Sequence, residues 1–265
     1  MRIFNAALKY ILLILCAFSL SLTQHKGDAF VKQGVDAFFN YEFEKSIEIL
    51  SKARSAYPAH PVVHVVWAAA WYHFDQSMFS ADSVYSNFEK RLNEIEFLYD
   101  SLVVVYPDNF EYLLYLGTSQ SLKARIYLGE KKYLSTFYAA YKGFKSIQKS
   151  EQGADKTKDV YLPIGVIEWY AGLKNPFIQI AARSMGINPS RKEGIKKMEV
   201  AANESAWAWI EAMSILSITY QFFDLNKEKG LLTSQTVSKK FPDNFGYGLS
   251  VSYTHLRAHE TPEHR

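Results

Sequence analysis

The sequence contains only one cysteine, Cys16, and this cysteine lies in an apolar run near the N-terminus. The rest of the chain therefore offers no intrachain disulfide, no thiolate nucleophile and no cysteine ligand for a metal. The chain also lacks the GxGxxG and Walker A phosphate-binding motifs, the GxSxG nucleophile motif and the HExxH zinc motif. We therefore expect a protein that is not an enzyme and that binds no cofactor and no metal.

The sequence also lacks a concentration of charge of one sign. Its formal net charge is +3, and Arg2 and Lys9 near the N-terminus supply two of these three charges. Binding of nucleic acid requires a concentrated basic surface that neutralises phosphates, so we expect no nucleic-acid partner. In contrast, hydrophobic residues make up 48% of the chain and aromatic residues 15%, which predicts a packed core rather than a disordered chain.

Residues 1–23 have the pattern of a secretory signal peptide, with Arg2 and Lys9 near a short apolar run and small residues at its end. An uncleaved membrane anchor is one alternative, although Asn5 and Lys9 interrupt the run of about 20 apolar residues that a span needs. Lipidation of Cys16 is another, although Leu15 stands where a small residue is expected. All three interpretations of the N-terminus predict export to the periplasm or to the outer membrane. We also expect a peripheral association with the envelope.

Hydrophobic residues recur at helical spacing through most of the remaining chain, and no segment shows the alternation of a strand. The pattern predicts an all-α protein. The helices expected from periodicity and from proline, glycine and capping residues are about 28–39, 43–56, 61–74, 81–106, 110–128, 131–149, 160–173, 177–185, 191–203, 205–223 and 227–241.

An aromatic residue followed by proline recurs after three of these helices, at Tyr57-Pro58, Tyr106-Pro107 and Phe241-Pro242. In the first and last cases a small residue, Ser46 or Gly230, lies twelve positions before the proline. The recurrence indicates repeated units of two helices, each unable to bury its apolar face alone.

The segment Ala29–Pro58 resembles a tetratricopeptide (TPR) unit, with Gly34, Ser46, Leu50, Ala53 and Pro58 at the positions where that family has small, large and proline residues. The stretch Asp159–Asn244 looks like exported bacterial TPR-like proteins. The resemblance implies a right-handed α-solenoid of antiparallel helix pairs that binds a protein or peptide partner in its concave groove. The first unit would then be an end cap of the array.

The domain organisation expected from these patterns has three parts. Residues 1–23 form the signal peptide, and residues 24–250 form the TPR-like domain, with an irregular fourth unit around Asn175-Pro176 and Asn188-Pro189. Residues 251–265 read VSYTHLRAHETPEHR and resemble the translated read-through of a sequencing adapter. We therefore expect them to be a non-native, disordered tail, with the native repeat domain truncated at its C-terminal end.

A non-catalytic exported scaffold or adaptor is the function that these features favour. We expect its groove to be lined by residues on the inner helices and in the fourth unit: Tyr112, Tyr115, Gln120, Lys123, Trp169, Tyr170 and Arg183. The alternative function is binding of a small ligand or glycan in an aromatic pocket formed near Trp169, with Tyr170 and Phe177.

Two other groups of polar residues invite a chemical interpretation. His60 and His64 are four residues apart, which would place them on one helix face, but no third and fourth zinc ligand accompanies them. Asp159 and Glu168 could perform acid–base chemistry, but no nucleophile is spaced to work with them. We interpret these residues as structural.

Overall fold

The computed structural model describes residues 25–154 and 156–259. This part of the chain forms twelve α-helices and one short 3-10 turn, and it contains no strand, which confirms the all-α prediction. The helices are α2 (Asp28–Phe39), α3 (Phe43–Ala56), α4 (Val63–Met78), α5 (Ala81–Val105), α6 (Phe110–Gly129), α7 (Tyr133–Ser150), α8 (Tyr161–Gly172), α9 (Pro176–Ser184), α10 (Arg191–Glu204), α11 (Trp209–Phe222), α12 (Lys227–Lys240) and α13 (Phe245–His259). The predicted signal peptide lies outside the described residues.

The helix ends follow local sequence signals. Helices α3, α5 and α12 end directly before Tyr57, Tyr106 and Phe241, because the proline that follows each aromatic residue lacks an N–H and restricts the residue before it. At the start of α10, the Ser190 hydroxyl accepts a hydrogen bond from the Glu193 N–H at 3.2 Å, which confirms the predicted N-cap.

Small residues allow successive helices to approach closely. In the first pair the Ser46 hydroxyl donates to the Gly34 carbonyl at 2.8 Å, and a Cβ at Gly34 would lie 2.5 Å from Leu50. In the α8–α10 pair, a Cβ at Gly194 would lie 2.6 Å from the Gly165 carbonyl oxygen. A larger residue at these crossings would force the two helix backbones apart.

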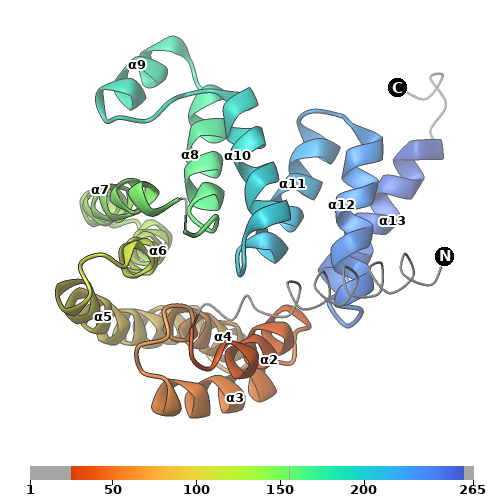
Figure 1. The fold of residues 1–265 in the computed structure, drawn as a ribbon. Coiled ribbons are helices and arrows are strands. Elements are labelled where there is room, and N and C mark those ends of the chain that lie inside the picture. Colours follow the sequence, from red (N-terminus) through yellow and green to blue (C-terminus); the bar gives the residue numbers. More distant parts are fainter. Residues whose placement is uncertain (1–24, 155, 260–265) are drawn as a thin grey trace, which may run out of the picture.

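Each helix packs mainly on its neighbours along the chain, except that α8 packs directly on α10, while the short helix α9 projects on the side of α8 away from α10 (Figure 1). The segment predicted to be irregular is thus a helix pair with an inserted third helix. The path of the helices curves through α2–α5, α6–α7, α8–α10 and α11–α13, and it brings the last helices back beside the first pair (Figure 1).

Polar and aromatic contacts join the two ends of this path. The side-chain amide of Asn40 donates to Asp243 at 2.8 Å, and the Asn244 amide donates to the Phe39 carbonyl at 2.8 Å. The Phe39 and Phe241 rings lie 5.9 Å apart between centroids. One buried cluster accordingly includes side chains from α2 and from the end of α12. The first unit therefore does not cap a free end, as the sequence suggested, because it packs against the last helices.

The C-terminal segment differs from the sequence prediction. Residues 251–259 continue α13 instead of forming a disordered tail, because adding residues to an existing helix costs little and nothing before Pro262 interrupts it. Residues 260–265 of that predicted tail lie outside the described residues.

His64 lies buried near the start of α4 as a neutral imidazole. Its Nδ1 accepts a hydrogen bond from the Arg54 Nε–H at 3.0 Å, and its Nε2 donates to the Pro58 carbonyl at 2.9 Å. Burial lowers the pKa of His64 to about 4, because the charged form is poorly solvated there and faces the Arg54 guanidinium. Protonation would also break the bond from Arg54.

Stability should therefore decline in mild acid. The unfolded chain takes up a proton on His64 below about pH 6.5, whereas the folded chain does so only near pH 4. The neutral His64 therefore makes its full contribution to the free energy of unfolding above pH 6.5, and this contribution is lost as the pH falls from 6.5 to 4. The expected loss is about 3 kcal/mol. Urea unfolding at several pH values should show a smaller acid dependence in His64→Gln, which keeps an acceptor and a donor. An equal acid dependence in both chains would contradict the assignment.

Candidate partner-binding site

Three of the residues predicted to line a groove are buried. Tyr112 is 4% exposed and donates from its hydroxyl to the Ala59 carbonyl at 2.7 Å, and Tyr115 packs parallel to Tyr99. Gln120 donates to Glu96 at 3.1 Å and is 1% exposed. The prediction was wrong because residues 112–117 are all buried, so neighbouring helices surround this part of α6 on every side. Periodicity alone does not show which helix is enclosed in this way.

Lys123, the fourth predicted groove residue, is committed to an ion pair. Its ammonium group and that of Lys142 both bind the Glu96 carboxylate, which links α6 and α7 to α5. Burial tends to raise the pKa of Glu96, but the hydrogen bonds from the two lysines outweigh it and the pKa is lowered. These three side chains therefore stabilise the packing of helices and do not face an open groove.

The residues predicted around Trp169 do not form one pocket. Trp169 is 8% exposed and packs edge to face against Phe223, with 4.9 Å between ring centroids. Tyr170, Phe177 and Arg183 are exposed to solvent. Consecutive helical residues such as Trp169 and Tyr170 point about 100° apart, so a pair of adjacent aromatic residues cannot line the same enclosed pocket. The aromatic pocket of the alternative prediction is therefore not formed.

A cavity of about 450 Å³ lies elsewhere, beside the turn between α5 and α6. Its polar lining side chains are Asp108 and Glu111, which are acidic, together with His25, Asn109, Lys156 and Thr157. They come from the residues before α2, the turn before α6 and its first residues, and the loop before α8. No motif groups these positions in the sequence, since up to 132 positions separate them, and so the sequence analysis missed them.

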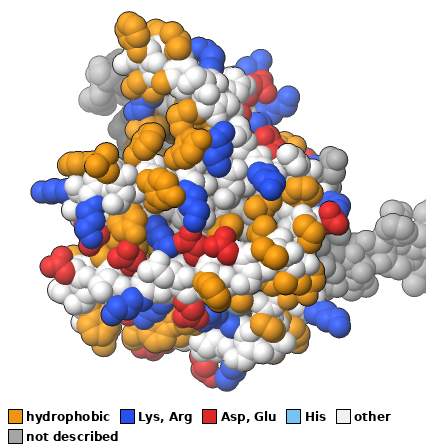
Figure 2. Space-filling view, turned by 90° about the vertical axis from the view of Figure 1, so that its left-hand side faces the viewer, with side chains coloured by type: hydrophobic (Ala, Val, Ile, Leu, Met, Phe, Trp, Pro, Cys, Tyr) orange, Lys and Arg blue, Asp and Glu red, His pale blue; other side chains and the backbone are white. Residues whose placement is uncertain are grey.

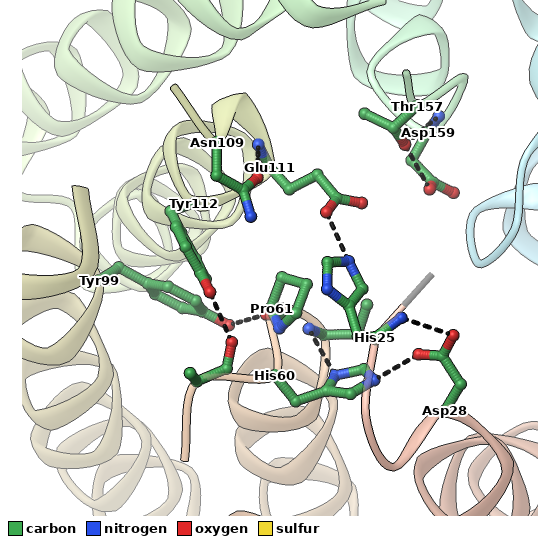
Figure 3. Close-up of polar contacts among 12 residues, drawn as sticks. His25, Asp28, His60, Pro61, Tyr99, Asn109, Glu111, Tyr112, Thr157 and Asp159 are labelled. Atoms are coloured by element: carbon green, nitrogen blue, oxygen red, sulfur yellow. Dashed lines mark hydrogen bonds and ion pairs between the residues drawn. The ribbon is translucent and has the colours of Figure 1, made fainter. Parts of the chain in front are cut away.

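His25 and Glu111, which line this cavity, belong to a network of polar contacts that continues to Asp28 and His60 (Figure 3). The His25 ring contacts the Glu111 carboxylate through Nε2 at 2.6 Å, and the His25 backbone N–H donates to Asp28 at 3.0 Å. The other Asp28 oxygen binds His60 Nε2 at 2.8 Å. The His25 and His60 rings meet edge to face at 5.6 Å. The network ties the segment before α2 to the starts of α4 and α6.

The pKa values of the two histidines shift in opposite directions. His60 Nδ1 accepts from the Val62 N–H at 3.2 Å, so its Nε2 carries the proton that binds Asp28, and burial lowers the pKa of this neutral ring. For His25, burial acts in the same direction, but the hydrogen bond and charge of Glu111 outweigh it and raise the pKa. His25 is thus held more readily in its charged form beside Glu111.

One carboxylate oxygen in this network lacks a partner. Glu111 is 4% exposed, its Oε2 binds His25, and its Oε1 is buried without a hydrogen bond within the described part of the chain. Asp159 lies close enough that the Glu111 charge adds to the burial that raises the pKa of Asp159. A buried carboxylate oxygen is a strong acceptor, so this oxygen favours a donor group, above all a cationic one, in the cavity.

The carboxylates weighed for catalysis have structural partners. Asp159 accepts the N–H groups of Trp207 and Ala208 at 2.9 and 2.6 Å, just before α11 begins. Glu168 pairs with Lys197 at 2.8 Å. Within residues 25–154 and 156–259, no group of three or more His, Cys, Asp or Glu side chains is arranged to hold a metal ion.

Comparison of the chain with protein-family models, with curated proteins and with solved structures finds no match. None of the described helices is long and apolar enough to cross a membrane.

Proposed function

We propose that this protein is a non-catalytic, exported scaffold of the cell envelope that binds a protein or peptide partner. Its helix pairs are interpreted as divergent TPR-like units of a right-handed solenoid, with α8–α10 as the irregular fourth unit. The paired packing of successive helices and the Gly34–Ser46 contact support this interpretation. The path of the helices curves until its two ends touch, and the residues that the sequence assigned to a groove are buried against neighbouring helices.

The cavity beside Glu111 is the proposed anchor site for the partner. The observation that carries this proposal is the unpartnered Glu111 Oε1, because the other oxygen of this buried carboxylate already binds His25. A lysine or arginine side chain, or a free N-terminal amine, would supply the missing donor. The cavity volume of about 450 Å³ suits one such side chain and not a folded domain.

Selection of peptides from a displayed random library on the purified chain should enrich sequences with a lysine, an arginine or a free N-terminus at one position. Glu111→Gln keeps the size and one acceptor but removes the charge, so binding of a selected peptide should weaken about tenfold or more. The same substitution at exposed Glu48, which pairs only with Lys52 on α3, is the matched control and should leave binding unchanged. Selection without a cationic preference, or equal binding by Glu111→Gln, would contradict the anchor site.

A further inference from the structure

Helix α7 carries two apolar stripes. One stripe is buried against α6 and contains Ala139, Gly143, Phe144 and Ile147. The other faces solvent and contains five large side chains at helical spacing, of which Leu134 is 88% exposed: Tyr133, Leu134, Phe137, Tyr138 and Tyr141. A solvent-facing stripe of this size is uncommon on a soluble monomer and marks an interaction surface.

Helix α9 extends this surface. Phe177, Ile178 and Ile180 are exposed, and Phe177 is 84% exposed. The end of α9 is held beside α7, because Lys145 donates to the Met185 carbonyl at 3.4 Å and Gln148 donates to the Gly186 carbonyl at 3.0 Å. Figure 2 shows hydrophobic side chains spread over this side of the molecule, with lysine and arginine side chains among them and acidic side chains below. We refer to the exposed residues of α7 and α9 as the α7–α9 face.

The charges on this face have a single sign. Neither α7 nor α9 contains an aspartate or a glutamate. The solvent-facing stripe of α7 continues from Tyr138 and Tyr141 into Lys142, Lys145 and Lys149, and α9 adds Arg183. The carboxylates beside this face belong to other segments: Glu96 binds Lys123 and Lys142, Glu130 binds Lys132, and Glu151, directly after α7, binds Lys197. The charge of Asp100 adds to the hydrogen bond with Glu96 that raises the pKa of Lys142.

We propose that the α7–α9 face docks on the surface of an anionic lipid membrane. Tyrosine, phenylalanine and leucine side chains would enter the boundary between headgroups and acyl chains, while Lys145, Lys149 and Arg183 would contact lipid phosphates. The cationic charge of α7 and α9 beside exposed apolar side chains is the combination that anionic lipid surfaces attract, and it distinguishes this face from a protein interface of mixed charge. The residues involved differ from those of the Glu111 cavity, so this proposal does not depend on the proposed function.

Sedimentation of the purified chain with vesicles tests the proposal. The chain should bind vesicles of phosphatidylcholine mixed with phosphatidylglycerol, bind vesicles of phosphatidylcholine alone far more weakly, and lose binding as salt is raised. The double variant Leu134→Ser/Phe137→Ser should bind at least tenfold more weakly. Leu232→Ser changes a leucine that is 65% exposed on α12, on the opposite side of the molecule in Figure 1, and should bind like the unmodified chain.

A second double variant tests whether binding to vesicles requires the positive charges of this face. Lys149→Gln/Arg183→Gln should weaken binding about fivefold for each charge removed, without altering the circular dichroism spectrum. Failure to bind anionic vesicles, or equal binding by the Leu134→Ser/Phe137→Ser variant, would overturn the proposal. So would sedimentation equilibrium in which the chain self-associates through this face and vesicles do not compete, since the occupant would then be a second copy of the chain.

Discussion

Replacing Phe241 with alanine should lower the free energy of unfolding by about 3–5 kcal/mol, the usual cost of removing a buried phenylalanine. Phe241 is 2% exposed at the end of α12. Its ring lies 5.9 Å from that of Phe39 in α2, 6.5 Å from that of Trp209 and 6.3 Å from that of Tyr247. The substitution would therefore open a cavity at the place where the first and last helices meet.

Urea unfolding followed by circular dichroism measures this loss. Phe245→Ala is the matched control, because Phe245 is the same residue type four positions later but is 68% exposed, and it should cost less than about 1 kcal/mol. A double-mutant cycle with Phe39→Ala should give a coupling of about 0.5–1.5 kcal/mol if the two rings are in contact. If Phe241→Ala were as stable as Phe245→Ala, the closed arrangement of the helices would be wrong.

Asp159→Ala should cost about 3–4 kcal/mol, because it leaves buried hydrogen-bond donors without an acceptor. The carboxylate is 2% exposed and accepts from Trp207 N–H, Ala208 N–H and the Thr157 hydroxyl, the last at 2.8 Å. Each unsatisfied buried donor costs about 1–3 kcal/mol, and the two backbone N–H groups cannot turn away toward solvent. The loss would separate the loop before α8 from the start of α11.

Asp159→Asn provides the comparison, since its amide oxygen still accepts the two backbone hydrogen bonds, and it should lose about half as much stability as Asp159→Ala. Thermal unfolding of the three chains at one pH gives the ranking. Equal stability of Asp159→Ala and the unmodified chain would show that Asp159 is not required for this contact, and would reopen its interpretation as a functional carboxylate.

Local signals predicted most of the fold. Proline at positions 58, 107 and 242 and the side chain of Ser190 act on backbone groups within four residues, so the helix ends could be read from the sequence. The small residues Gly34 and Ser46 likewise identified the first pair, because two helices joined by a short turn pack against each other. The continuation of α13 through residues 251–259 was missed, since it depends on a helix that begins earlier.

The candidate site could not be predicted in this way. His25, Asp28, His60 and Glu111 come from three separate segments, and each residue alone is an ordinary helix-start or loop residue. For Tyr112 and Gln120 the sequence did suggest a site, but it was wrong, because their helical spacing is compatible with either an inner groove or a buried contact between helices. The exposed stripe of α7 was predicted as part of an amphipathic helix, but its periodicity could not show that the stripe stays uncovered.

The sequence by itself determined the helices, their ends and the pairing of neighbours, because these depend on backbone chemistry and contacts close along the chain. Only the tertiary structure decided which faces are enclosed. The accumulated curvature of the helix pairs brings Asn40 to Asp243, while packing against neighbouring helices buries Tyr112 and Gln120 and leaves the α7–α9 face uncovered. Such curvature is the sum of small packing angles at every pair, and no single stretch of sequence records it.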